Sequence, residues 1–222
     1  MISVPNLKHS AFCLIVAVVL NGGAVTLSQD SPPTRPMVVL IGPPLSGKTT
    51  FVTPIQGRYG IPGISIEDLI KDHASELRKM HRGRTSMAEM RYDPAMSRYL
   101  RARLGGMDLS RGAALDGFPA TKQQAEELAK MIQELHLDPI VLQLEIPDDV
   151  VRKRAAAAGR QSDQPKIIEQ RIKDYHREFD MISVYYPNAK IVKIDGTQSE
   201  EKMWKTIQQA LDGAKLRLAE KK

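Results

Sequence analysis

The 222-residue sequence predicts a three-layer α/β domain, in which a parallel β-sheet carries helices on both faces. Two observations lead to this fold class. Short apolar runs rich in β-forming residues alternate with longer segments of helical period. The first run leads into Gly42-Pro43-Pro44-Leu45-Ser46-Gly47-Lys48-Thr49, which fits the phosphate-binding loop pattern G-x-x-x-x-G-K-[ST] at every fixed position. A ligand is therefore expected at the carboxyl ends of the strands.

The phosphate-binding loop lies between an expected strand at 37–41 and an expected helix at 49–59, in which Pro54 would have to sit or form a kink. Its glycines let successive backbone N–H groups point at phosphate oxygens, and the positive end of the helix adds to the attraction. We expect Lys48 to reach the outer phosphates and the Thr49 hydroxyl to ligate Mg²⁺. The loop therefore predicts nucleotide binding.

The bulk composition describes one ordinary soluble globular domain, with 26 % charged and 42 % hydrophobic residues. A net charge of +6 is compatible with nucleic acid binding, but the basic residues are spread along the chain without interleaved aromatic residues. Because a protein that handles polyphosphates also needs positive charge, no nucleic acid partner is expected. The single cysteine, Cys13, excludes an internal disulfide and a zinc site built from cysteines.

The first residues differ in character from the rest. Lys8 precedes an uncharged apolar run at 11–20, and small residues follow at the two cleavage positions, Gly22 and Ala24. A basic start, an apolar run of this length and a small-x-small site predict a signal peptide over residues 1–24. The apolar run is too short to be a comfortable permanent membrane span.

Residues 25–36 are rich in proline and serine and predict a flexible tether, so the folded domain is expected over residues 37–222. The predicted location is therefore outside the cytoplasm, either periplasmic or secreted. The alternative is a cytoplasmic protein whose start codon is mis-assigned.

The remaining elements are expected in a regular order. They are a very short strand at 64–65, a helix from about 67 to 80, a basic polar segment at 81–91, a helix at 94–104, a strand ending at Asp116, a helix at 122–135, a strand at 140–145, a helix at 148–158, a polar loop at 159–165, a helix at 166–185, a strand at 191–194 and a final amphipathic helix from about 203 to 218. Asp93 is a suitable cap and Pro94 a suitable first residue for the second of these helices, and Gly159 is a natural stop.

Asp116 ends an apolar run and precedes the turn Gly117-Phe118-Pro119. An aspartate at the end of a strand beside a phosphate-binding loop can hold Mg²⁺ or its waters. An aspartate at such a position is also a common turn or helix cap. The residues alone leave both roles open.

Several of these landmarks, in this order, resemble the adenylate kinase family of nucleoside monophosphate kinases. The resemblance covers about residues 37–211 and rests on the loop at 42–49, Gly60-Ile61-Pro62, Ile64-Ser65, Asp68-Leu69, Asp116-Gly117-Phe118-Pro119 with Thr121 and Gln124-Ala125, Arg154, Gly159-Arg160, Pro165, Arg171 with Tyr175-His176, and Ile194-Asp195-Gly196-Thr197. It implies a P-loop kinase fold with a small helical acceptor-binding insertion at about 66–98 and a short lid at about 155–166. It also implies small-molecule nucleotides as partners and a monomer.

The implied reaction is reversible transfer of the γ-phosphoryl group of MgATP to AMP, in which positioning and charge stabilisation supply most of the catalysis. The implied catalytic residues are Lys48, Arg154, Arg160 and Arg171, and Asp163 matches a lid aspartate of the family. ATP would bind the loop at 42–49, Thr50 and Arg154, and Mg²⁺ would bind Thr49 and Asp116, partly through water. The implied acceptor-binding residues are Ser65, Lys71, Asp116, Gly117, Gln124, Arg160 and Arg171, with Gln124 reading the AMP base.

The departures from the family pattern concern the acceptor site. Ile66-Glu67-Asp68 stands where the family usually has Thr-Gly-Asp, Lys71 replaces an arginine, and Ala120 replaces the arginine that clamps the AMP phosphate. Losing such a charge-assisted contact costs about 1.5–3 kcal/mol, or about ten- to a hundredfold in acceptor binding. Candidates to compensate are Arg82, Arg84, Arg91 and Arg98 from the insertion.

Two alternative functions follow from these departures. One is a P-loop kinase with a different acceptor. The other is a nucleotide-binding protein with little or no transfer activity, which an exported location would favour because ATP is scarce there. A protein that only binds nucleotide has no need of Arg154, Arg160 and Arg171 together, so their presence favours the enzyme.

Overall fold

The structure is a computed structural model that describes residues 35–82, 87–160, 163–186 and 189–214. All of these residues belong to one compact unit, Pro32–Lys222. The predicted signal peptide and nearly all of the predicted tether lie outside the described residues. Within the described ranges, no helix is both long and apolar enough to cross a membrane.

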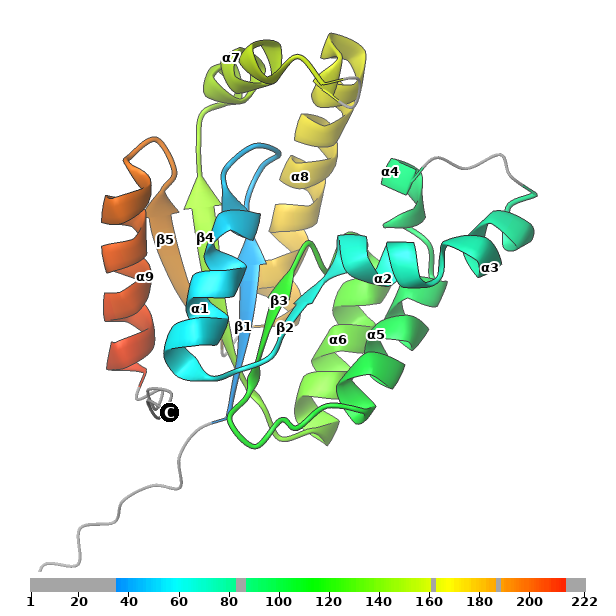
Figure 1. Cartoon of the computed structure of the whole chain (residues 1–222), viewed down its shortest axis with the longest axis vertical. Coiled ribbons are helices and arrows are strands. Elements are labelled where there is room, and N and C mark those ends of the chain that lie inside the picture. The colour runs from blue at the N-terminus through cyan, green and yellow to red at the C-terminus, as the bar shows by residue number, and fades with distance from the viewer. Residues whose placement is uncertain (1–34, 83–86, 161–162, 187–188, 215–222) are drawn as a thin grey trace, which may run out of the picture. The chain divides into compact units, whose positions relative to one another are not determined.

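A five-stranded parallel sheet forms the centre of this unit, with its strands in the order β2-β3-β1-β4-β5 (Figure 1). The strands are β1 (Pro36–Ile41), β2 (Gly63–Ser65), β3 (Ala113–Asp116), β4 (Asp138–Glu145) and β5 (Lys190–Asp195). All of β1 is buried, as expected for a central parallel strand paired on both edges. Leu40 lies beside Asp116, the last residue of β3, on one edge and beside Leu142 on the other, so β1 and β3 end at nearly the same level while β4 continues to Glu145.

The helices lie on both faces of the sheet (Figure 1). They are the short 3₁₀ helix η1 (Lys48–Phe51), α1 (Val52–Tyr59), α2 (Ile66–Asp72), α3 (Ala74–Met80), α4 (Met87–Met90), α5 (Ala95–Gly105), α6 (Lys122–Glu134), α7 (Asp148–Ala158), α8 (Pro165–Tyr185) and α9 (Glu200–Gly213). This arrangement confirms the predicted three-layer α/β fold.

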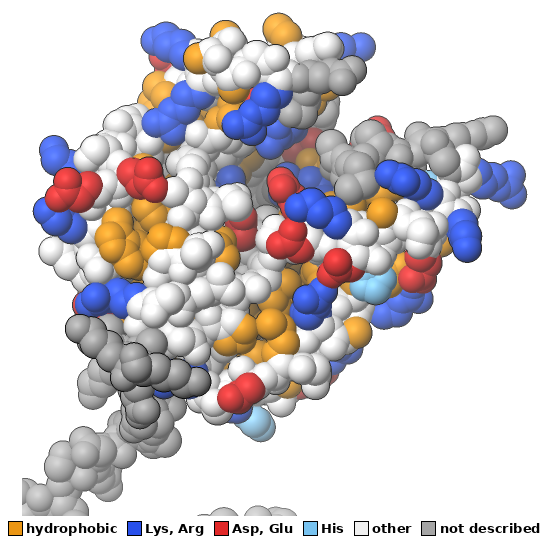
Figure 2. Space-filling view, in the orientation of Figure 1, with side chains coloured by type: hydrophobic (Ala, Val, Ile, Leu, Met, Phe, Trp, Pro, Cys, Tyr) orange, Lys and Arg blue, Asp and Glu red, His pale blue; other side chains and the backbone are white. Residues whose placement is uncertain are grey.

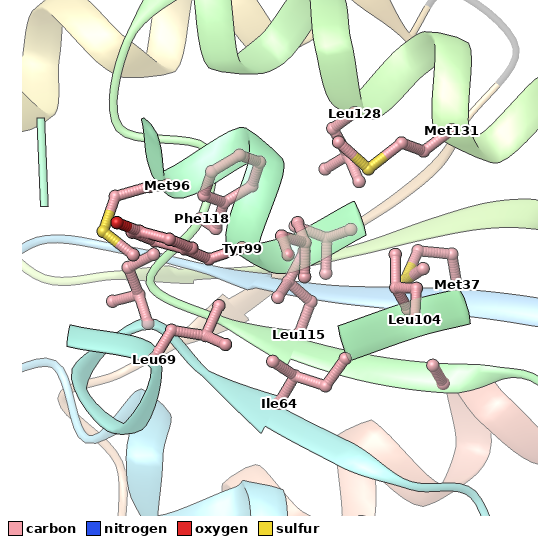
Figure 3. Close-up of a cluster of buried hydrophobic side chains, with 14 of the residues drawn as sticks. Met37, Ile64, Leu69, Met96, Tyr99, Leu104, Leu115, Phe118, Leu128 and Met131 are labelled. Carbon is pink, nitrogen blue, oxygen red and sulfur yellow. The ribbon is translucent and has the colours of Figure 1, made fainter. Parts of the chain in front are cut away.

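Two apolar cores cover the two faces, because successive side chains of β1 point in opposite directions. Met37 and Val39 pack in a cluster with residues of β2, β3, α2, α5 and α6, part of which is drawn in Figure 3. Val38 and Leu40 pack on the opposite face with residues of α1 and α9. A third, smaller cluster joins α7 to α8. The sheet is thus held from both sides, and its carboxyl edge is left to the loops.

Two predicted helices differ from the structure. The helix after the phosphate-binding loop begins as the 3₁₀ helix η1, and Pro54 lies in the first turn of α1, where its missing N–H breaks no helical hydrogen bond. The single helix predicted at 67–80 is wrong, because it is divided at His73 into α2 and α3. The His73 ring stacks on Tyr99 of α5, with 3.7 Å between ring centroids, so we attribute this break to packing between α2 and α5.

The start of α5 differs by one residue from the expected bound. The helix begins at Ala95, and Pro94 occupies the cap position. The Asp93 carboxylate still performs the capping function, because its Oδ1 accepts a hydrogen bond of 2.7 Å from the Ala95 N–H. Its Oδ2 pairs with the His81 ring. The basic segment expected at 81–91 contains the short helix α4, which no periodicity indicated.

Candidate active site

The phosphate-binding loop follows β1 at the carboxyl edge of the sheet (Figure 1). Glycine is required at position 42, because a Cβ there would lie 2.6 Å from the carbonyl oxygen of Leu144. Gly47 has a φ of 90°, a left-handed conformation that glycine adopts without strain. Ser46, within the loop, is fully buried. Close packing on β4 and these two glycines therefore give the loop its curled shape.

Lys48 folds back across the mouth of this loop. Its Nζ donates hydrogen bonds of 2.8 and 2.9 Å to the carbonyl oxygens of Gly42 and Pro43. The Ser46 hydroxyl lies 3.5 Å away. The ammonium group is therefore held where the loop would receive a phosphate chain. Thr50, the last residue predicted to bind ATP, is exposed on η1.

Thr49 and Asp116 meet at the ends of η1 and β3. The Thr49 hydroxyl donates a hydrogen bond of 2.7 Å to Oδ2 of Asp116. Asp116 is only 5 % exposed, and its other oxygen, Oδ1, is buried without a hydrogen-bond partner. Burial raises the pKa of the Asp116 carboxyl, while the Thr49 hydrogen bond and the Lys48 charge act in the opposite direction. The pair therefore presents an uncompensated oxygen next to the phosphate-binding loop.

This oxygen arrangement fits Mg²⁺. The ion takes hard oxygen ligands, typically one or two from protein together with waters and substrate phosphates. A buried carboxylate oxygen with no donor also costs free energy until a cation or donor reaches it. Across the described ranges, no group of three or more His, Cys, Asp or Glu side chains could hold a metal alone. The donor set of Thr49 and Asp116 thus suits an ion shared with a nucleotide.

Arg154 of α7 lies at the rim of the loop. Its Nη1 donates to the Leu45 carbonyl at 2.9 Å, and its Nη2 donates to the Gly196 carbonyl at 2.8 Å. A Cβ at Gly196 would lie 2.6 Å from a methyl group of Ile146, so only glycine allows this close approach. Arg154 therefore joins α7, the phosphate-binding loop and the turn after β5. Figure 2 shows basic side chains over the region of α7.

Arg160 and Arg171 meet at Asp163, in the segment between α7 and α8. Nη1 of Arg171 lies 3.3 Å from one oxygen of the buried Asp163 carboxylate, and Nε of Arg160 lies 3.8 Å from the other. Burial lowers the pKa of Arg171, and the positive charge of Arg91 lowers it further. Arg160 itself is exposed. One carboxylate thus holds together two of the four residues predicted to be catalytic.

Gln124 of α6 is fully buried, and its amide is engaged by the backbone. Oε1 accepts a 2.7 Å hydrogen bond from the Ala120 N–H. Nε2 donates to the carbonyl oxygens of Arg91 at 2.8 Å and Asp93 at 3.2 Å. Since a primary amide has only two N–H donors, none remains for a nucleotide base in this conformation. Gln124 fixes the segment around Arg91 against the turn after β3.

The other predicted acceptor residues are also tied to near neighbours. The Ser65 hydroxyl accepts from the Glu67 N–H at 3.2 Å and caps α2. Lys71 is exposed and pairs with Asp68 at 3.0 Å. Gly117 has a φ of 78°, and a Cβ there would lie 2.5 Å from a methyl group of Ile66. The isoleucine at the departure from the family pattern thus packs directly on the turn.

Sequence reasoning missed one connection between the insertion and α8. The Tyr92 hydroxyl donates a hydrogen bond of 3.1 Å to Oδ2 of Asp174, a residue 82 positions further along the chain. No spacing or motif in the sequence could indicate a contact of this kind. It places the segment that follows α4 beside the helix that carries Arg171.

Comparison with known proteins decides the family. The family model for adenylate kinase matches residues 40–191. The chain belongs to the adenylate kinase family. It is 31 % identical over 188 residues to the adenylate kinase of Micrococcus luteus, covering 78 % of this chain and 89 % of the relative. The adenylate kinases of Corynebacterium urealyticum (33 % identical, 79 % and 98 % covered) and Xanthomonas oryzae (30 %, 78 % and 98 %) are also similar.

Membership of the adenylate kinase family makes this chain a phosphotransferase of the nucleoside monophosphate kinase class. The matched range contains the loop, Asp116, the Asp163 cluster and the whole insertion. The position where the family pattern has a phosphate-clamping arginine holds Ala120, which is 3 % exposed. The donor side thus keeps the predicted family residues, and the acceptor side differs.

A stability measurement tests the structural role of Gln124. Replacing it by methionine, which has a similar volume, leaves three backbone groups without their partner, two of them in buried hydrogen bonds and the third in a partly buried one. We expect the free energy of unfolding to fall by about 3 kcal/mol, measured by urea denaturation. Gln123→Met, at the exposed neighbouring position of the same helix, is the matched control. Equal effects of the two substitutions would contradict the backbone-bridging role.

Proposed function

We propose that this protein reversibly transfers the γ-phosphoryl group of MgATP to AMP, forming two molecules of ADP. The observation that carries the proposal is the hydrogen bond of Thr49 to the buried Asp116, whose other carboxylate oxygen has no partner, directly beside a phosphate-binding loop. Family membership supports the same reaction class. A loop, a cation at its mouth and an oxygen pair for Mg²⁺ are the parts that phosphoryl transfer needs on the donor side.

The donor phosphates would bind in the loop, with Lys48 turning from the carbonyl oxygens of Gly42 and Pro43 to the outer phosphates. Thr49 and Asp116 would hold Mg²⁺, which when bound neutralises charge on the phosphate oxygens. Arg154 is already fixed at the rim of the loop by two carbonyl oxygens, which use two of its five N–H donors. The donor site is therefore largely preorganised.

In the transfer itself, an oxygen of the acceptor phosphate forms a bond to the γ-phosphorus, and the bond from that phosphorus to the β,γ-bridging oxygen breaks. The electron pair stays on the β-phosphate of the departing ADP. Negative charge spreads over the three equatorial oxygens during this step. Arg160 and Arg171, held by Asp163 at the lid, supply planar donors that stabilise this charge.

The test is transfer of labelled γ-phosphate from MgATP by the full-length protein to a panel of AMP, GMP, CMP and UMP. We expect labelled ADP from AMP, dependent on Mg²⁺. Transfer to a different monophosphate, with none to AMP, would replace AMP as the acceptor. ATP binding without transfer to any acceptor would exclude the kinase and leave a nucleotide-binding protein.

A kinase of the same donor chemistry with a different acceptor is the second candidate. It is favoured by the engaged amide of Gln124, since the predicted base-reading group is committed to backbone partners. The acceptor panel separates it from the first candidate. An acceptor other than AMP would have to be read by groups other than this amide.

We also infer export from the sequence of residues 1–24, which predicts a signal peptide. A monomer is the expected state from the family resemblance. Cell fractionation followed by N-terminal sequencing of the mature chain tests export. A full-length chain recovered only from the cytoplasm, with its first residues intact, would contradict it.

A further inference from the structure

The insertion carries several basic residues, and two of them have carboxylate partners. Lys71 pairs with Asp68 at 3.0 Å, and Arg98 pairs with Glu76 at 2.9 Å. Within the described residues Arg91 forms no ion pair with a carboxylate, and unlike the equally unpaired Arg78, Lys79 and Arg82, which are exposed, it is partly buried. Its charge is therefore not neutralised within the described structure.

The contacts of Arg91 direct it to the turn after β3. Its Nη2 lies 3.4 Å from the Gly117 carbonyl oxygen, and its Nε is buried without a hydrogen-bond partner. Its guanidinium lies 5.4 Å from the centre of the neighbouring Tyr92 ring. A partly buried guanidinium with an unused donor is costly unless an anion or acceptor reaches it.

The charge of Arg91 acts on two residues of the candidate active site, Asp116 and Arg171. Its positive charge acts on Asp116, where it opposes the effect of burial on the pKa, and on Arg171, whose pKa it lowers. Two guanidinium groups that repel one another in this way are stabilised by an anion that both can bind. The hydrogen bond from Tyr92 to Asp174 keeps the segment next to α8, which carries Arg171.

The backbone of Arg91 is fixed as well as its side chain. Its carbonyl oxygen accepts a 2.8 Å hydrogen bond from the buried Gln124 amide, whose oxygen binds the Ala120 N–H. The same glutamine therefore connects the segment of Arg91 to position 120. Gln124 acts here as a positioning residue, holding Arg91 beside the position from which the arginine is missing.

We propose that Arg91 binds the phosphate of the acceptor nucleotide, taking over from the arginine that is absent at Ala120. Arg171 would bind the same phosphate from the opposite side. The inference rests on the proposed function for the identity of the acceptor, and it adds a contact between Arg91 and the phosphate of that acceptor. Of the four candidate arginines, Arg98 is paired with Glu76, and Arg84 lies outside the described residues.

Equilibrium binding to the full-length protein, measured by isothermal titration calorimetry, tests this contact. The ligands are AMP, GMP, CMP and UMP, each compared with its nucleoside, which lacks the phosphate. Arg91→Met is expected to weaken binding of the preferred monophosphate by about tenfold to a hundredfold and to leave nucleoside binding unchanged. Arg91→Lys, which keeps charge without the planar fork, should fall between. Arg98→Met is the matched control on the same insertion.

The outcomes separate this inference from the proposed function. Equal monophosphate binding by wild type and Arg91→Met would overturn the inference, even if the wild type phosphorylates AMP. Equal losses of affinity for the monophosphate and for its nucleoside in Arg91→Met would also overturn it, because they would indicate a structural role. A wild-type protein that binds no monophosphate more tightly than its nucleoside would overturn it as well. Arg91-dependent binding without transfer would leave the inference standing and refute the kinase.

Discussion

Replacing Lys48 by methionine is expected to lower kcat for phosphoryl transfer by about a thousandfold. The Lys48 ammonium lies at the mouth of the phosphate-binding loop, within 2.9 Å of two loop carbonyl oxygens. Methionine has a similar length and removes the charge. Because charge on the transferring phosphoryl oxygens develops next to this group, its loss should affect the transition state more than the bound ground state.

Steady-state kinetics with varied ATP and saturating acceptor measure this effect. We expect kcat to fall far more than the KM for ATP rises, since the loop backbone continues to bind the phosphates. Lys205→Met is the matched control, because Lys205 is exposed on α9 and its one ion pair among the described residues is with Glu201, one turn away. A Lys48→Met protein that folds normally and keeps kcat within tenfold of wild type would remove Lys48 from the transfer step.

The fold was accessible from the sequence because its main signals are local. A buried parallel strand appears as a short apolar run, and every strand of the sheet was expected within two or three residues of its observed bounds. The long helix α6 has a clear apolar stripe and a Thr121 cap, so its bounds agree to one residue. Such features need no information from distant parts of the chain.

The break between α2 and α3 was not accessible, because its cause lies elsewhere in the fold. His73 is neither proline nor glycine, and no local pattern stops a helix there. Its ring stacks on Tyr99, so the direction of the chain is decided by packing against α5. Helix α4 is too short for any periodicity to show it.

The candidate site likewise contains residues that the sequence predicts and contacts that it does not. The loop and Asp116 are recognisable from short patterns, and the structure brings Thr49 and Asp116 into contact. The engagement of Gln124 was not predictable, because its carbonyl partners are 31 and 33 positions away. For the same reason the sequence could offer four arginines as replacements at the acceptor site without distinguishing Arg91 among them.

Replacing Asp116 by asparagine is expected to lower Mg²⁺-dependent kcat by about a hundredfold or more, since the carboxylate that fits the ion is lost. The same substitution should not destabilise the apo protein at neutral pH. Asp116 is 5 % exposed with one oxygen unpartnered, and an uncharged amide is easier to bury than a carboxylate. Loss of activity without loss of stability is therefore the expected signature of this position.

The raised pKa of Asp116 determines how its contribution to the free energy of unfolding changes with pH. Burial raises the pKa of Asp116 above the value of about 3.9 of an unfolded chain. Between these two pKa values the native state binds more protons than the unfolded state, so the contribution of this group to the free energy of unfolding falls as pH rises through that window. Above the native pKa the carboxylate of Asp116 is ionised in both states, so its unfavourable contribution to the free energy of unfolding no longer changes with pH.

Urea denaturation of wild type and Asp116→Asn from pH 3.5 to pH 8, without Mg²⁺ or nucleotide, measures this difference. The variant should gain stability relative to wild type as pH rises through the window, and the difference should then remain constant. Adding Mg²⁺ with ATP at pH 8 should stabilise wild type more than the variant, because only wild type offers the carboxylate to the ion. A stability difference that does not change with pH would show that the Asp116 pKa is not raised. A variant that is inactive and stabilised by MgATP as strongly as wild type would show that this carboxylate acts in the transfer without holding the ion.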